Sequence, residues 1–171
     1  MDKRKLLMKL PKEKLVELLH ITGKDFWNVQ GNWIYWVENN YGLKRVGEAD
    51  AVVFAEIARV ETYRIKKLFN LGNDVSALIR SLELVTYTGG FIEPEFREVS
   101  DKHFTLYISR CGQDLRKAQG HSELPCKEAG LACFINQAKI INPKFKASCK
   151  FCPPDKHPKD YWCAWIVYLQ E

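Results

Sequence analysis

The order of apolar and polar positions gives the first half of the chain a helical period. In residues 11–21, Leu15, Leu18 and Leu19 fall on one helical face, and Pro11 occupies a position that a helix start tolerates. The pattern predicts a short amphipathic helix that ends at Gly23.

An aromatic segment follows at residues 25–42, where Trp27, Ile34 and Tyr41 lie seven residues apart and so share one face of a helix. Gly42 is suited to end this helix. Glu38 lies at the edge of the aromatic face, which leaves two readings open. Its carboxylate either hydrogen-bonds a neighbouring helix end or lies in an aromatic pocket, where burial would raise its pKa and suit it to proton transfer.

Two more helices are predicted before residue 88. Residues 47–69 carry Val53, Ile57, Val60, Arg64 and Leu68 at steps of four and three, which indicates one face of a helix. Residues 75–85 repeat the helical period after a polar break at residues 70–74. The pair Gly89-Gly90 then closes the helical part.

Beyond the double glycine the period changes from about 3.6 to 2. Residues 91–99 and 103–110 predict a hairpin, in which Phe104, Leu106 and Ile108 share one face. A helix from Cys126 to about residue 141 ends before Pro143. Residues 145–151 and 161–169 predict a second hairpin, joined by the proline-rich loop 152–160.

These elements predict an α+β fold, in which an N-terminal helical module precedes an antiparallel sheet made of two hairpins with a helical crossover between them. We expect one domain over residues 1–171, with a helical half at 1–88 and a sheet-plus-helix half at 91–171. The length of 171 residues is sufficient for a core that folds without disulfides.

Composition and charge narrow the class of protein. The chain is 46% hydrophobic and 27% charged, it has no uncharged apolar run long enough for a membrane span, and its start lacks a secretory signal. We therefore expect a soluble cytoplasmic protein that does not bind membranes. The net charge of +5 is concentrated near the two ends without a dense basic run, so nucleic-acid binding is not expected. A homodimer is left open.

The six cysteines are the main candidates for chemistry, and three of them lie between residues 149 and 163. Cys149 and Cys152 have the spacing of half a metal site. If Phe151 pairs with Tyr161 in the last hairpin, Cys149 lies opposite Cys163.

The predicted metal ligands are the thiols of Cys126, Cys149, Cys152 and Cys163, with Cys111 and His157 as alternates. Zinc is the expected metal, ahead of an iron–sulfur cluster. Cys133 lies about 10 Å along the helix from Cys126, too far to share a zinc ion with it, and is expected to be a buried apolar side chain. Buried or loop thiols without a metal, and a redox or nucleophilic pair, are the alternatives.

Cys126 has a second reading because it lies at a predicted helix start. The free amides and the dipole of a helix N-terminus lower the pKa of a thiol, which would suit Cys126 to metal binding or to nucleophilic attack. His121 and Glu123 are near it in sequence as candidate bases, and an inert half-buried cysteine is the alternative.

Four segments together resemble a known group of proteins: residues 32–42 (NWIYWVENNYG), 123–126 (ELPC), 149–155 (CKFCPPD) and 162–165 (WCAW). They resemble an uncharacterised family of cytosolic proteins from archaea and anaerobic bacteria. That family is distantly similar to the L-2-aminothiazoline-4-carboxylate hydrolase-like and four-vinyl-reductase (V4R) small-molecule-binding groups. The resemblance implies an α+β fold with a small-molecule pocket between helices and sheet, and supplies no catalytic residue.

These observations lead to three functional expectations. The first is a cytosolic small-molecule-binding domain with a cysteine-bound metal and a ligand pocket that includes Trp27, Glu38, Tyr41 and Trp165. The second is a hydrolase acting on a small heterocycle or amide through Cys126 or a metal-bound water. The third is a structural or interaction module without a cavity.

Overall fold

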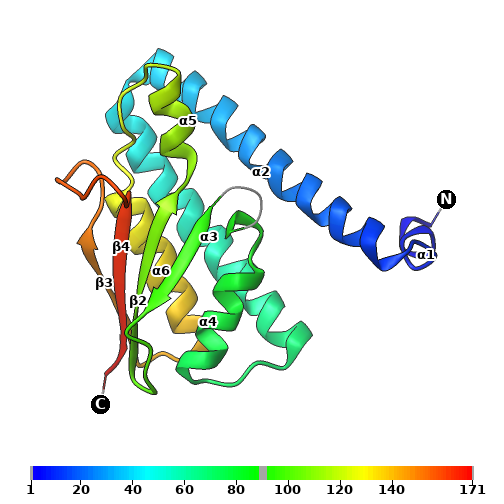
Figure 1. Ribbon diagram of the computed structural model, residues 1–171. Helices are drawn as coiled ribbons and strands as arrows, with labels where there is room; N and C mark the ends of the chain where they lie inside the picture. Colours follow the sequence, from blue (N-terminus) through cyan, green and yellow to red (C-terminus); the bar gives the residue numbers. More distant parts are fainter. Residues whose placement is uncertain (1, 89–91, 171) are drawn as a thin grey trace.

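The computed structural model describes residues 2–88 and 92–170, and it consists of helices packed on one face of a four-stranded sheet (Figure 1). The order of its elements is α1 (Lys3–Leu7), α2 (Lys12–Tyr41), α3 (Leu43–Phe69), α4 (Val75–Leu84), the 3-10 turn η1 (Thr86–Thr88), β1 (Glu93–Arg97), β2 (His103–Arg110), α5 (Gly112–Ala118), α6 (Lys127–Ile141), β3 (Phe145–Phe151) and β4 (Cys163–Leu169). The predicted α+β class is confirmed.

The sheet is antiparallel and has the strand order β1-β2-β4-β3. The predicted hairpins are β1–β2 and β3–β4, and α5 and α6 make the helical crossover between them. The predicted start of the first strand, at Phe91, lies outside the described residues. The strand predicted at 161–169 begins two residues later, at Cys163.

The main core lies between the sheet and helices α4 and α6. Phe104, Leu106 and Ile108 alternate along β2 and join this core, as their spacing predicts. The fully buried side chains of Phe145 and Trp165 come to the same core from β3 and β4. Because β2 and β4 are the two central strands, their inward side chains have helices above them and neighbours on both sides.

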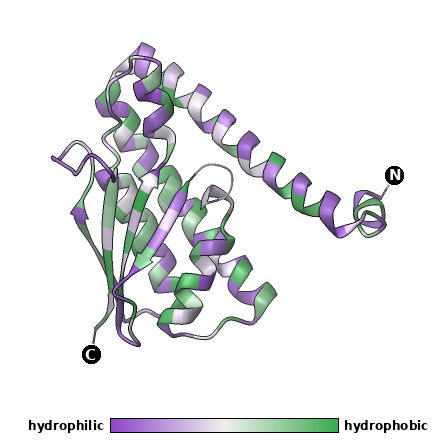
Figure 2. Ribbon diagram, in the orientation of Figure 1, coloured by the Kyte–Doolittle hydropathy of each residue, from purple (hydrophilic) through white to green (hydrophobic). Residues whose placement is uncertain are grey.

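Helix α2 is one continuous helix, so the predicted end at Gly23 is wrong. A glycine inside a helix costs only about 1 kcal/mol, and the flanking residues have helical character on both sides. The half of α2 before Phe26 projects from the body of the protein (Figure 1). Apolar side chains such as Leu19 and Ile21 are exposed along it. In Figure 2 hydrophobic positions of this part are coloured green.

Helix α3 forms where the period predicts a helix, but the predicted apolar face is largely the exposed one. Val53 and Leu68 on that face are 49% and 77% exposed. The buried positions instead include small and polar residues, among them Gly47, Asp50 and Ala58. Small residues are buried on this face because α3 packs closely against α6 and against the segment that precedes α6. A Cβ atom at Gly47 would lie 2.9 Å from the side chain of Pro125 in that segment.

No helix in the described part of the chain is long and apolar enough to cross a membrane.

Candidate functional site

A cavity of about 160 Å³ lies between the helices and the sheet. Its walls come from helices α2, α3, α4 and α6, the turn η1, strands β1, β2 and β4, and the start of α5. The lining is mostly apolar and aromatic, and includes Trp27, Phe54, Tyr87, Phe134 and Trp165. Side chains from both halves of the sequence therefore enclose one apolar space.

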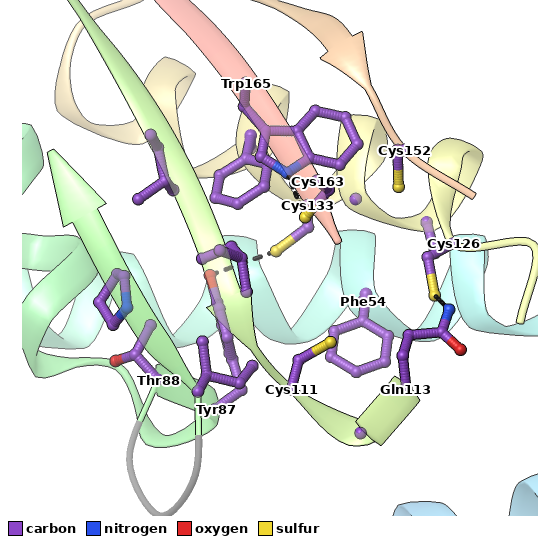
Figure 3. A pocket seen from close by; sticks show the side chains of 18 of the residues that line it. Phe54, Tyr87, Thr88, Cys111, Gln113, Cys126, Cys133, Cys152, Cys163 and Trp165 are labelled. Atoms are coloured by element: carbon purple, nitrogen blue, oxygen red, sulfur yellow. Dashed lines mark hydrogen bonds between the residues drawn. The ribbon is translucent and has the colours of Figure 1, made fainter. Parts of the chain in front are cut away.

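Five of the six cysteines line this cavity (Figure 3), and all six thiols are free. The five are Cys111, Cys126, Cys133, Cys152 and Cys163. They come from the starts of α5 and α6, the middle of α6, the end of β3 and the start of β4. Elements distant in sequence thus place their thiols around the same space.

The thiols of Cys152 and Cys163 interact with each other. Cys152 donates a hydrogen bond to Cys163, and the indole nitrogen of Trp165 lies 3.1 Å from the sulfur of Cys163 as a second donor. The hydrogen bond from Cys152, followed by that from Trp165, outweighs burial and lowers the pKa of Cys163. The same pairing raises the pKa of Cys152. Cys163 is therefore the thiol of this pair that loses its proton first.

The predicted position of Cys149 is wrong. Cys149 pairs with Trp165 rather than Cys163, and Phe151 pairs with Ala164 rather than Tyr161. The pairing shifts by one residue between Cys149 and Phe151, because β3 carries an irregularity there that a strict alternation does not include. Cys149 packs against the main core and is not among the described residues that line the cavity.

The two predicted alternate ligands lie in different places. Cys111 lines the cavity at the start of α5. His157 stays in the proline-rich loop, where its Nδ1 atom is 3.0 Å from the carbonyl oxygens of Pro158 and Tyr161. Within residues 2–88 and 92–170, no group of three or more His, Cys, Asp or Glu side chains has the arrangement of a metal site. The metal site and the choice of zinc stay predictions.

The expected lowering of the Cys126 pKa is wrong. Cys126 precedes α6 as its N-cap residue, as the sequence indicates, but its side chain is half-buried and burial raises the pKa of its thiol well above the ordinary value. Desolvation opposes the thiolate more strongly than the helix end favours it. The side-chain amide of Gln113 donates to the Cys126 sulfur at 3.2 Å, and the cavity lining includes no histidine among the described residues.

Two of the four predicted pocket residues line the cavity. These are Trp27 and Trp165, whereas Glu38 and Tyr41, both described by the structure, are not in its lining. Tyr41 is exposed at the end of α2. Glu38 forms a two-point ion pair with Arg116 of α5, with N–O distances of 2.9 and 3.1 Å. Of the two readings of Glu38, the structural one agrees with this contact to a neighbouring helix.

Sequence reasoning missed Asp50 of α3. Its side chain lines the cavity and is only 5% exposed, and burial raises the pKa of its carboxyl group to about 6. The available signal was its spacing, because Asp50 lies four residues before Phe54, which also lines the cavity. That spacing places the carboxylate on the same helix face as an aromatic ring. Sequence reasoning did not use this face, because the apolar period that runs from Val53 to Leu68 on the exposed face is more regular.

A comparison with protein families gives one match. Residues 8–169 match DUF6125, a family of unknown function. The chain belongs to this family. No curated protein and no solved structure matches the chain. Similarity to the hydrolase-like and V4R groups stays a prediction.

Proposed function

We propose that this member of the DUF6125 family is a small-molecule-binding domain whose ligand occupies the cavity between helices and sheet. The observation that carries the proposal is the cavity of about 160 Å³ with its apolar and aromatic lining. A designed apolar cavity of about 150 Å³ in another protein stays dry and binds benzene. A molecule with one ring, or a short aliphatic molecule, therefore fits this space.

The position of the cavity supports a binding role over a purely structural one. Protein interiors are packed closely, so a void of this size leaves its lining without contacts that a filled core would provide. A side chain that could have filled it is small where it lines the cavity, as Ala129 of α6 is. In a structural or interaction module nothing compensates for the lost contacts. A bound ligand would restore the contacts of the lining side chains.

Binding of 2-phenylethanol, a neutral one-ring probe, tests the proposal. The expected result in ¹H–¹⁵N correlation spectra is a saturable shift of backbone amides around the cavity, among them Gly130 and Cys163. Ala129→Leu adds bulk to a lining position and should abolish these shifts. Ala132→Leu makes the same change on α6 at a position outside the cavity lining, and should leave binding intact. The absence of any saturable shift in the unmodified protein, with this probe and with its amine and carboxylate analogues 2-phenylethylamine and phenylacetate, would refute the proposal.

A thiol-bound metal ion is a second candidate, supported by the four thiols of Cys111, Cys126, Cys152 and Cys163 that line one cavity. A zinc site needs Zn–S distances of about 2.3 Å in a tetrahedral arrangement, so side chains would have to rotate on binding. Elemental analysis of protein purified without added metal is the test. Zinc or iron at one equivalent supports a metal site, and its absence removes this candidate.

Hydrolysis through Cys126 has less support. A cysteine nucleophile needs a thiolate and a base within hydrogen-bond reach. The pKa of Cys126 is raised by burial, and its hydrogen-bond partner, Gln113, is an amide that cannot accept the proton as a base. Binding is therefore the function that this geometry supports best.

A further inference from the structure

Asp50 gives the cavity a chemical preference. It is the only charged residue among the described residues that line the cavity, and its side chain is 5% exposed. A carboxylate held in an apolar space loses most of its hydration and is costly unless a donor or a positive charge compensates it. The described lining includes no lysine, arginine or histidine to do this.

The hydrogen bonds of Asp50 leave part of this cost uncompensated. Its Oδ2 atom accepts one long hydrogen bond, at 3.5 Å, from the side-chain amide of Gln30. Its Oδ1 atom is buried and has no hydrogen-bond partner among the described residues. Burial raises the pKa of Asp50 to about 6, so the carboxyl group is still mostly ionised at pH 7.5. Asp50 is therefore a buried anion in the wall of the ligand space, and one of its acceptor atoms is unused.

Aromatic rings lie next to this anion. Phe54 follows Asp50 by one helical turn, and its ring stacks on that of Trp27 with a centroid distance of 6.2 Å and an angle of 30°. The ring of Tyr87 also contacts Phe54, edge-on and with a centroid distance of 6.1 Å. Aromatic faces attract cations as well as apolar groups. A carboxylate beside such faces favours a ligand that combines a positive charge with a hydrocarbon body.

We propose that the cavity binds a small apolar amine, whose ammonium group pairs with the carboxylate of Asp50 while its hydrocarbon part contacts the aromatic wall. The inference rests on the proposed small-molecule-binding function and names the ligand class for that site. A neutral ligand would leave the carboxylate uncompensated, and an anionic ligand would add repulsion in a space of low polarity. The cavity therefore discriminates by charge as well as by size.

A series of three probes with similar size and different charge tests the inference: 2-phenylethylamine, 2-phenylethanol and phenylacetate. Isothermal titration calorimetry at pH 7.5 should give the amine the highest affinity, about tenfold or more above the alcohol, with phenylacetate the weakest. Equal affinities for the amine and the alcohol, or a preference for phenylacetate, would overturn the inference while leaving the binding function in place. Failure of all three probes to bind would refute the binding function, and the inference with it.

Asp50→Asn provides the matched variant, since it removes the charge and keeps nearly the same shape. It should reduce affinity for the amine by about tenfold or more and leave that for the alcohol nearly unchanged. Asp25→Asn removes an exposed carboxylate of α2 outside the cavity lining and should alter neither. Retention of the amine preference in a folded Asp50→Asn protein would overturn the assignment of Asp50. If that variant does not fold, the three probes on the unmodified protein still decide the question.

Discussion

The burial of Asp50 predicts that removing its charge stabilises the empty protein at neutral pH. In the folded protein the pKa of Asp50 is raised to about 6, whereas an aspartate in an unfolded chain has a pKa of about 3.9. Desolvation is the main cause, and the hydrogen bond from Gln30 offsets it only in part. The folded state therefore favours the neutral carboxyl group, and stability is lost as the pH rises from about 4 to about 6.

The size of this effect follows from the difference between the two pKa values. At 1.36 kcal/mol for each pH unit, ionised Asp50 lowers the free energy of unfolding by about 3 kcal/mol at pH 7 and by about 1.5 kcal/mol at pH 5. Asp50→Asn resembles the neutral carboxyl group and lacks this pH dependence. Its stability relative to the unmodified protein should rise by about 2 kcal/mol between pH 4 and pH 7, since part of the effect is already present at pH 4.

Urea unfolding at pH 4, 5, 6 and 7, followed by tryptophan fluorescence, measures this difference. Other carboxyl groups titrate in the same range, so the quantity to compare is the difference between the two proteins at each pH. Asp25→Asn controls for the loss of a surface charge and should change stability little at any pH. A difference between Asp50→Asn and the unmodified protein that stays constant from pH 4 to pH 7 would refute the argument.

Three further changes test the packing around the cavity. Gly130→Ala would place a methyl group 2.4 Å from the Trp165 ring, and the resulting overpacking should cost about 1–3 kcal/mol in chemical unfolding; an unchanged midpoint would show that the ring moves freely. Arg116→Ala leaves Glu38 without its partner and should cost about 3 kcal/mol, with much of the loss recovered when Glu38→Gln is added; no recovery would argue against the ion pair as the cause. Cys126 should react with iodoacetamide at pH 7.5 much more slowly in the folded protein than in urea, because burial raises its pKa, and mass spectrometry of the labelled peptide would show equal rates if this reasoning fails.

Features that depend on residues close together in the sequence were predicted correctly, and features that depend on distant segments were not. Helix and strand periods depend on neighbours a few residues apart, and they predicted α4, α6 and the alternation of Phe104 and Leu106 in β2 correctly. The face of α3 that is buried depends on what packs against it. Glycine and alanine allow α6 to approach closely, so small residues are buried while Val53 remains exposed.

In the candidate site, too, local rules predicted positions along the chain but not the surroundings of the side chains. A local rule placed Cys126 at a helix start, but its pKa depends on the enclosing side chains, which reverse the expected shift. A local rule also placed Cys149 opposite Cys163, but β4 begins at Cys163 and the regular register of the hairpin pairs Cys149 with Trp165. Trp27 and Trp165 were predicted as pocket residues and line the cavity. Asp50 was missed because a carboxylate on a helix gives no sign by itself of whether water reaches it.

The sequence by itself therefore determined the α+β class, the two hairpins and the positions of most helices, because these depend on the local period of apolar side chains. Only the tertiary structure decided that five cysteines, two tryptophans and one aspartate surround a common cavity. The physical reason is that desolvation and packing arise between elements far apart in the chain. Burial and packing make Asp50, one of many carboxylates on helices, a buried anion in the wall of a cavity the size of a small ligand.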